Sequence, residues 1–328
     1  MSGPDASRTL RPAVPVDVAL TLGVLQRGHA DPCVRAAPEG VWLTRRVDAD
    51  GAPVPASLLV RPAASAVRPS AIRVEAWGPG AQAAVAEAEA LLGLHDDGWA
   101  AFEDLLTSGG QRLPHHVASA RRTRPGLRLP AHGRLAEQLV TVVLEQKVTH
   151  DQARHGWRQL VRAVSEPAPG PAPRGMLLPP DPRAVLRVPS WDWHRFWVQP
   201  AQAKAILQVA ERAEAVDRLG RQVRPGDVAA TAELARRLQS LPGIGAWTVA
   251  EALQRSHGAS DLVAVGDFHL AHHVGQVLTG RRVDDAGMLR LLEPWAGHRQ
   301  RLVRMIGLSG ERRERFGPRL APEDHRRR

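Results

Sequence analysis

Apolar residues alternate with other residues over the first part of the chain, with the two-residue period of a β-strand. The predicted strands are 16–24, 41–47, 57–60 and 72–77, and turns rich in Gly, Pro and Asp separate them. The next segment, 82–92, has Ala and Leu at helical spacing. We therefore predict an antiparallel sheet domain with a covering helix at 15–93, preceded by a disordered segment at 1–14.

From about residue 96 the apolar residues recur every three to four positions, which is typical of helices. The predicted helices are 132–148, 199–218, 232–240, 246–255, 268–278 and 285–306. The segment 166–174 has proline at four alternate positions, so we expect an extended, solvated linker there. The pattern predicts an α+β fold: the small sheet domain, an all-α domain at 94–311, and a flexible basic tail at 312–328.

Basic residues outnumber acidic ones. The chain has 44 Lys and Arg against 34 Asp and Glu, a formal net charge of +10. Nearly all of the basic residues are Arg, and Tyr is absent, as GC-rich codon usage would produce. The type of basic residue is therefore uninformative, whereas the positive excess favours a polyanionic partner. Charge alone leaves nucleic-acid binding undecided.

Cysteine content and hydropathy bear on the compartment. Cys33 is the only cysteine, so no intramolecular disulfide can form, which suits a reducing cytoplasm. The sequence has no run of about 20 apolar residues that could span a membrane. Its first residues lack the apolar core of a signal peptide. We expect a soluble, cytoplasmic protein.

A glycine-rich turn lies between two of the predicted helices. The segment 241–245 reads Leu-Pro-Gly-Ile-Gly, and Gly243 and Gly245 place two glycines at alternate positions. Backbone N–H groups at such a turn, together with the dipole of the following helix, suit a phosphate. Asp267 follows 22 residues after Gly245, at the start of another predicted helix. A carboxylate at that distance changes a phosphate-binding hairpin into a candidate active site.

These residues resemble the helix-hairpin-helix DNA glycosylases. The similarity is greatest to the monofunctional branch that excises alkylated purines such as 3-methyladenine. The resemblance implies a two-lobed helical domain, Asp267 as the catalytic residue, and damaged double-stranded DNA as the partner. It implies a monomer working in base excision repair at the bacterial nucleoid. An aspartate before a helix is also an ordinary N-cap, and both roles can coexist.

Two positions indicate the subclass. Members that also cleave the DNA backbone carry a nucleophilic lysine two residues after the second hairpin glycine, and this chain has Trp247 there. A Schiff base cannot form at that position. Another subclass holds an iron–sulfur cluster on four cysteines, which a chain with only Cys33 cannot build. Monofunctional hydrolysis without a cofactor is the remaining expectation.

The resemblance assigns DNA contacts to several further residues. Gly243, Gly245 and the amides near Thr248 would bind a phosphate, and the carbonyls of Gln239, Leu241 and Ile244 could hold a structural Na⁺ or K⁺. Gln146 and Lys147 match the tip that enters the minor groove and fills the gap left by the flipped base. Lysine departs from the usual apolar wedge, and a solvated lysine at a helix end is the alternative.

Aromatic residues suggest a base pocket. Trp247 occupies a position that is aromatic in the alkyladenine branch, and Trp191 and Trp193 belong to a tryptophan cluster. Aromatic faces suit cationic alkylated bases, although ordinary core packing is the alternative for Trp193. Arg304 stands where that branch commonly has another tryptophan. The base preference therefore stays open: a glycosylase for another damaged or mismatched base, or a non-catalytic DNA-binding hairpin protein, are the alternatives.

Overall fold

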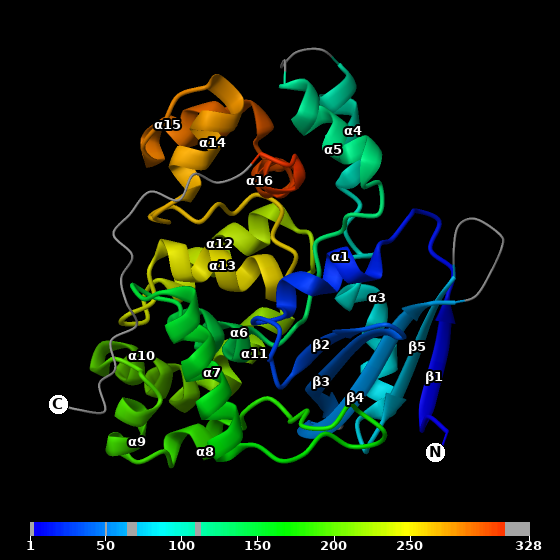
Figure 1. Ribbon diagram of the computed structural model, residues 1–328, viewed down its shortest axis with the longest axis vertical. Helices are drawn as coiled ribbons and strands as arrows, with labels where there is room; N and C mark the ends of the chain where they lie inside the picture. Colours follow the sequence, from blue (N-terminus) through cyan, green and yellow to red (C-terminus); the bar gives the residue numbers. More distant parts are fainter. Residues whose placement is uncertain (1–2, 50, 64–70, 109–112, 312–328) are drawn as a thin grey trace.

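The alternating part of the chain folds as one five-stranded antiparallel sheet in the computed structural model, which describes residues 3–49, 51–63, 71–108 and 113–311 (Figure 1). The strands are β1 (Ala6–Leu10), β2 (Val34–Ala37), β3 (Gly40–Ala49), β4 (Ala52–Pro62) and β5 (Ile72–Trp77), in the order β1-β5-β4-β3-β2. With the helices that follow, the sheet confirms the predicted α+β class. The tail expected at 312–328 lies outside the described residues.

Both faces of the sheet are covered. Helix α2 (Ala81–Ala86) packs against four of the strands on one face. On the other face the rings of Trp42 and Trp77 stack with their centroids 5.3 Å apart, and Met176 packs on them. Gly170 lies against Trp77, where a Cβ would meet the Trp77 side chain at 2.4 Å. The segment 166–174 is thus not the solvated linker that its prolines suggested: it covers the apolar outer face of the sheet.

The remaining chain is helical. The elements are α1 (Val18–Leu22), η1 (Gly23–Leu25), α3 (Ala88–Leu91), α4 (Trp99–Thr107), α5 (His115–Thr123), α6 (Leu135–Val143), α7 (His150–Val164), α8 (Pro182–Leu186), α9 (Ser190–Arg195), α10 (Pro200–Glu211), α11 (Ala213–Arg221), α12 (Val228–Leu238), α13 (Ala246–Ser256), α14 (Leu270–Thr279), α15 (Asp285–Leu292), η2 (Glu293–Trp295) and α16 (Arg299–Leu308). No described helix is both long and apolar enough to cross a membrane.

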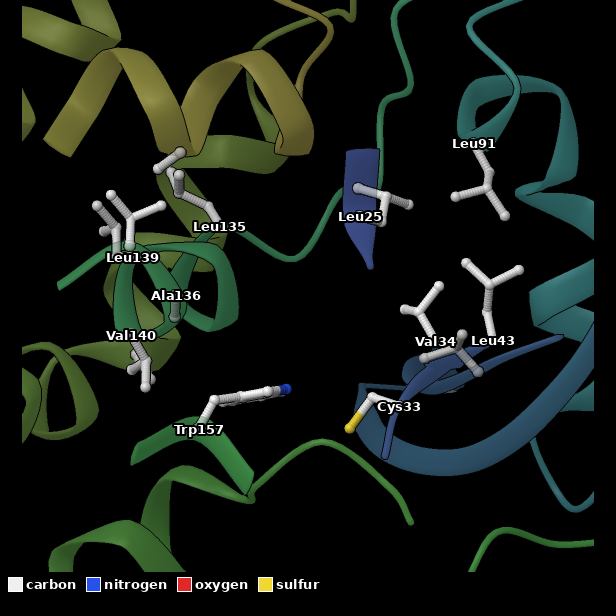
Figure 2. Packing of buried hydrophobic residues seen from close by; sticks show 14 of the residues in the cluster. Leu25, Cys33, Val34, Leu43, Leu91, Leu135, Ala136, Leu139, Val140 and Trp157 are labelled. Atoms are coloured by element: carbon white, nitrogen blue, oxygen red, sulfur yellow. The ribbon is translucent and has the colours of Figure 1, made fainter. Parts of the chain in front are cut away.

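The buried side chains form two main cores, which correspond to two helical lobes. The larger core joins the sheet to α6, α7 and α10–α13, and Figure 2 shows Leu43 of β3 and Leu135 of α6 within it. The second core joins α4 and α5 to α14–α16. Trp247 and Leu262 pack against both cores, so the lobes meet there.

The beginning of the chain differs from the prediction. Residues 6–10 were expected to be disordered, but they pair with β5 as an edge strand whose Ala6 and Leu10 are buried. The alternating segment 16–24 was expected to be a strand, but it contains α1. Asp17 caps this helix by accepting a hydrogen bond from the Leu20 N–H at 2.9 Å. Val18 and Leu22, four residues apart, then face the core.

Two long predicted helices are each broken. The segment 285–306 divides into α15, η2 and α16, because Pro294 lacks an N–H and Gly297 adopts a positive φ of 86°. The segment 199–218 divides into α10 and α11 at Arg212, whose backbone leaves the helical region. No proline or glycine marks that second break, so the local sequence does not predict it.

Candidate functional site

The turn between α12 and α13 has the predicted hairpin geometry. Ile244 is buried and its N–H donates to the Leu241 carbonyl at 3.0 Å, which closes the turn. Gly243 has φ +81°, and a Cβ there would lie 2.9 Å from the Cβ of Ala205 on α10. Gly245 is exposed, and a Cβ there would meet nothing within 4 Å. The first amides of α13 therefore open onto solvent beside a residue without a side chain, where an anion can approach.

Asp267 lies just before α14. Its Oδ1 accepts hydrogen bonds from the backbone N–H groups of His269 and Leu270 at 2.9 and 2.8 Å. Its Oδ2 accepts one from the Trp247 indole N–H at 3.3 Å. The side chain stays partly exposed, and Gly266 before it takes φ +88°. Helix α14 and the hairpin helix α13 together orient the carboxylate, so hairpin and aspartate form one site.

Gln146 and Lys147 lie in the turn after α6, which reaches the same hairpin. The Gln146 side-chain amide donates to the Gly243 carbonyl at 2.9 Å and to the Thr248 hydroxyl at 2.8 Å. The Thr248 side chain is buried, so its hydroxyl serves Gln146 and only its backbone amide can serve a phosphate. Lys147 is exposed and takes a left-handed φ of 52°. The residues predicted as wedge, hairpin and catalyst are adjacent in space.

Comparisons with known proteins bear on the fold. No protein-family model and no curated protein matches the sequence. The solved structure of the 3-methyladenine DNA glycosylase from Archaeoglobus fulgidus is similar to this chain, with a TM-score of 0.69 and 14% identity over 92% of this chain and 98% of that one. The chain has the helix-hairpin-helix DNA glycosylase fold.

A second solved structure with this fold is named for a different activity. The 8-oxoguanine glycosylase/lyase from Clostridium acetobutylicum, in its apo-form, matches with a TM-score of 0.66 and 9% identity over 94% of this chain and 98% of that one. The same protein has been solved with double-stranded DNA containing cytosine opposite to 8-oxoG, and it matches with a TM-score of 0.64. The fold is therefore shared by proteins named for different bases.

Two of the predicted pocket tryptophans do not reach this site. Trp191 and Trp193 lie on α9, at the opposite end of the molecule from α14 in Figure 1. Trp193 is buried and packs edge-on against Phe196, with ring centroids 6.2 Å apart, whereas Trp191 is 65% exposed. Placing them in the base pocket was wrong, because α9 lies far from α14, with Trp193 packed in the core and Trp191 on the surface. Trp247 alone among the three contacts Asp267.

Charged side chains extend from Trp247 along α13. Glu251 and Arg255 follow it at four-residue intervals on one helix face and form an ion pair at 2.7 Å. Arg304 of α16 interacts electrostatically with both. Burial, followed by the charge of Arg255, lowers the pKa of Arg304 to about 10, so it stays cationic at neutral pH. Arg304 forms no hydrogen bond or ion pair with any residue that the structure describes.

A second ion pair joins this group. Arg27, which follows η1, pairs with Glu145 at the end of α6 and donates to the Thr141 hydroxyl at 3.2 Å. Glu145 also interacts electrostatically with Arg255. We call Arg27, Glu145, Glu251, Arg255 and Arg304 the charged cluster. It contains three cations and two carboxylates, and Arg304 is the cation left without an ion-pair partner in the described part of the chain.

The hairpin carbonyls fit the cation that the resemblance implies. The Leu241 carbonyl accepts only the Ile244 N–H, and those of Gln239 and Ile244 accept no hydrogen bond from the described residues. Carbonyl oxygens with free lone pairs are suitable Na⁺ or K⁺ ligands. A cation held by these three carbonyls would add positive charge beside the amides of α13.

Sequence reasoning missed Gln202 on α10 and most of the charged cluster. Gln202 is buried, and its side chain bonds to the turn that carries Gln146. A sequence signal exists only for its other role: Gln199 and Gln202 form a capping box at the start of α10, with Pro200 at the first helical position. Its contacts with the α6 turn join residues 56 or more positions apart, which no local pattern encodes.

Proposed function

We propose that the protein is a monofunctional DNA glycosylase that hydrolyses the N-glycosidic bond of alkylated purines in duplex DNA and so initiates base excision repair. The observation that supports this most is the single Trp247–Asp267 contact that joins the hairpin to a carboxylate at the start of α14. A phosphate-binding hairpin by itself needs no such carboxylate. The glycosylase fold supports the same class of activity.

The chemistry follows from where the carboxylate lies. Breaking an N-glycosidic bond generates an oxocarbenium-like sugar, and a nearby carboxylate stabilises its positive charge. Asp267 has solvent access and can also orient the attacking water. The amides of α13 hold the DNA backbone next to the target nucleotide. A cationic alkylated base leaves readily without a proton donor, so the carboxylate suffices and no organic cofactor is required.

Trp247 supports the monofunctional assignment. It stands where the lyase subclass has its lysine, and its indole N–H is directed at Asp267 rather than offering an amine to the sugar. The product is therefore the free base and an intact abasic site. We propose that the protein acts on DNA as a monomer, since all of these groups come from one chain.

Another damaged base is the second candidate substrate class. Two of the tryptophans expected to stack on a cationic base are elsewhere, and the unpaired Arg304 adds positive charge to the cluster that extends along α13 from Trp247. Arginine donors suit a neutral base that presents carbonyl or ring-nitrogen acceptors. The proposal therefore needs a panel that contains both kinds of lesion.

The deciding experiment is base release from duplex DNA containing 3-methyladenine, 7-methylguanine, hypoxanthine or uracil. We expect the wild type to release methylated purines and Asp267→Asn to be at least about 100-fold slower while still binding DNA. Asp284→Asn is the matched control, because Asp284 likewise caps a helix, α15, by accepting the Gly287 N–H at 2.8 Å, whereas the Gly266 N–H beside Asp267 is accepted by Asp285.

Two outcomes would contradict the proposal. Equal loss in Asp284→Asn and Asp267→Asn would mean that Asp267 matters only as a helix cap. Strand cleavage by the purified wild type, before any alkali treatment, would remove the monofunctional assignment. Release of hypoxanthine or uracil alone would favour the second substrate class.

A further inference from the structure

Gln202 holds the turn that carries the wedge residues. Its side-chain nitrogen lies 3.2, 3.1 and 3.0 Å from the carbonyl oxygens of Val143, Leu144 and Gln146. These carbonyls are at the end of α6, where a helix runs out of its own N–H donors. The Gln202 residue is only 3% exposed, so the amide satisfies the turn from inside the protein and cannot itself reach DNA.

The other end of Gln202 is fixed as well. Its Oε1 accepts the Gln199 N–H at 2.9 Å, which anchors the side chain to the first turn of α10. On the outer side of the same wedge turn, the Gln146 amide is bound to Gly243 and Thr248. The turn is thus attached to α10 on one side and to the phosphate-binding hairpin on the other.

Lys147 is the residue that needs this support. It has φ +52°, a conformation that costs a residue with a Cβ roughly 1–2 kcal/mol. The neighbouring bonds hold it there: the carbonyl before it, that of Gln146, is bound by Gln202, and the amide side chain of Gln146 is bound by the hairpin. The exposed lysine side chain therefore leaves the turn in a direction that these two attachments determine.

We infer that Gln202 is a positioning residue that presets the Lys147 wedge for base flipping, an inference that rests on the proposed glycosylase function. A leucine or methionine could fill the same buried volume, so the amide is explained by its hydrogen bonds, to the Gln199 N–H through Oε1 and to the three carbonyls through its nitrogen, rather than by packing. The inference assigns Gln202 to opening the base pair and not to cleaving the glycosidic bond. Its loss should therefore matter only when the target base must be extracted from a pair.

The test compares Gln202→Met with wild type on two duplexes, one with the lesion paired and one with the lesion opposite an abasic site. Methionine keeps the length and removes both the amide donor to the turn and the Oε1 acceptor of the Gln199 N–H. We expect release from the paired lesion to fall about tenfold or more and release from the unpaired lesion to change less than threefold, because the unpaired base is already easier to flip. Thermal melting checks that the variant folds.

Gln254→Met is the matched control. Gln254 is a buried glutamine that donates to the Leu262 carbonyl at 2.9 Å, away from the wedge turn. We expect it to slow both substrates equally, if at all. Equal slowing of paired and unpaired lesions by Gln202→Met would show a merely structural role and overturn the inference, as would no slowing of either in a folded variant.

A second readout separates this inference from the proposed function. Fluorescence of 2-aminopurine next to the target base reports unstacking without any chemistry, and it can be recorded in Asp267→Asn as well. We expect a rise with wild type that Gln202→Met reduces. If wild type unstacks the base but releases none, the glycosylase proposal fails and the wedge inference stands. If wild type and Gln202→Met give the same signal, including no signal, the wedge inference fails.

Discussion

Arg304 is the residue on which we expect base preference to depend most. It is cationic at neutral pH, and the structure gives it no ion-pair partner among the described residues, although it interacts electrostatically with Glu251 and Arg255. A unit charge a few ångströms from a cationic base repels it by about a few kcal/mol at the effective dielectric of a protein. Removing that charge should therefore favour cationic bases over neutral ones.

We expect Arg304→Gln to raise the release of 7-methylguanine relative to hypoxanthine by about tenfold, which corresponds to about 1.4 kcal/mol. Competition between the two lesions in one reaction measures this ratio directly. Arg290→Gln, an exposed arginine on α15, is the control and should leave the ratio unchanged. A ratio that Arg304→Gln also leaves unchanged would place Arg304 outside the base pocket.

Single residues differ in how far the sequence identifies them. Gly243, Gly245 and Asp267 are recognisable because their spacing is local and each residue type has a backbone or chemical reason. Trp193 is not, because an indole serves equally well in a core or in a pocket, and only the packing of α9 decides between them. The role of Gln202 cannot be predicted from the sequence either, because the carbonyls that its side chain binds belong to another helix.

At the scale of elements, alanine substitutions at the two hairpin glycines should affect different properties: stability at Gly243 and DNA binding at Gly245. A Cβ at Gly243 combines a positive φ of 81° with a 2.9 Å contact to Ala205, so Gly243→Ala should lower the free energy of unfolding by about 1–3 kcal/mol. A Cβ at Gly245 meets nothing within 4 Å and needs no unusual backbone, so Gly245→Ala should fold normally. It should nonetheless bind DNA about tenfold more weakly, because the methyl group stands where the phosphate approaches.

Thermal melting and a DNA titration at fixed salt, applied to both variants, test this pair. Each variant is the control for the other, since the substitution is the same and the positions are two residues apart. Wild-type affinity of Gly245→Ala would mean that the phosphate binds elsewhere. A melting temperature of Gly243→Ala equal to that of wild type would mean that α10 yields to the added methyl group.

Elements were predictable where local pattern and tertiary packing agree. Residues 72–77 form the predicted strand, and α13 extends the predicted 246–255 by one residue, because in each case one apolar face meets the core. The segment 16–24 has both an alternating pattern and an i, i+4 pair, and the Asp17 cap decides for the helix. The edge strand β1 has only two buried residues, so pairing with β5, rather than any apolar period, defines it.

At the scale of the whole molecule, the sheet and the first lobe share buried ionisable groups. Asp31 and Glu137 line a small cavity between them, together with His132. Asp31 accepts hydrogen bonds from the Cys33 N–H at 2.8 Å and the Trp157 indole at 3.2 Å. The Nε2 atom of His132 lies 3.6 Å from the Oε1 atom of Glu137. The sequence does not predict that these side chains meet, because they come from a loop and two separate parts of the helical domain.

Glu137 makes the stability of this junction depend on pH. Burial, opposed by the charges of Arg134 and Arg45, raises the pKa of Glu137 from 4.5 to about 7. The folded protein therefore binds a proton more readily than the unfolded chain, and the stabilisation is fully present below pH 4.5 and lost as the pH rises through about 7. This rise in the pKa corresponds to at most about 3–4 kcal/mol. Burial lowers the pKa of His132, so the contribution of His132 to stability has the opposite pH dependence and is lost as the pH falls.

The variant Glu137→Gln isolates the carboxylate, because His132 is present in both proteins. We expect the melting temperature of wild type minus that of Glu137→Gln to fall by roughly 5 °C as the pH rises from 5 to 8. Glu214→Gln, whose carboxylate is 91% exposed on α11, is the control and should show no such trend. A difference that rises with pH would mean that Glu137 is held ionised by Arg134 and Arg45, and that the sheet is attached to the helical lobe by an ion pair instead of a neutral acid.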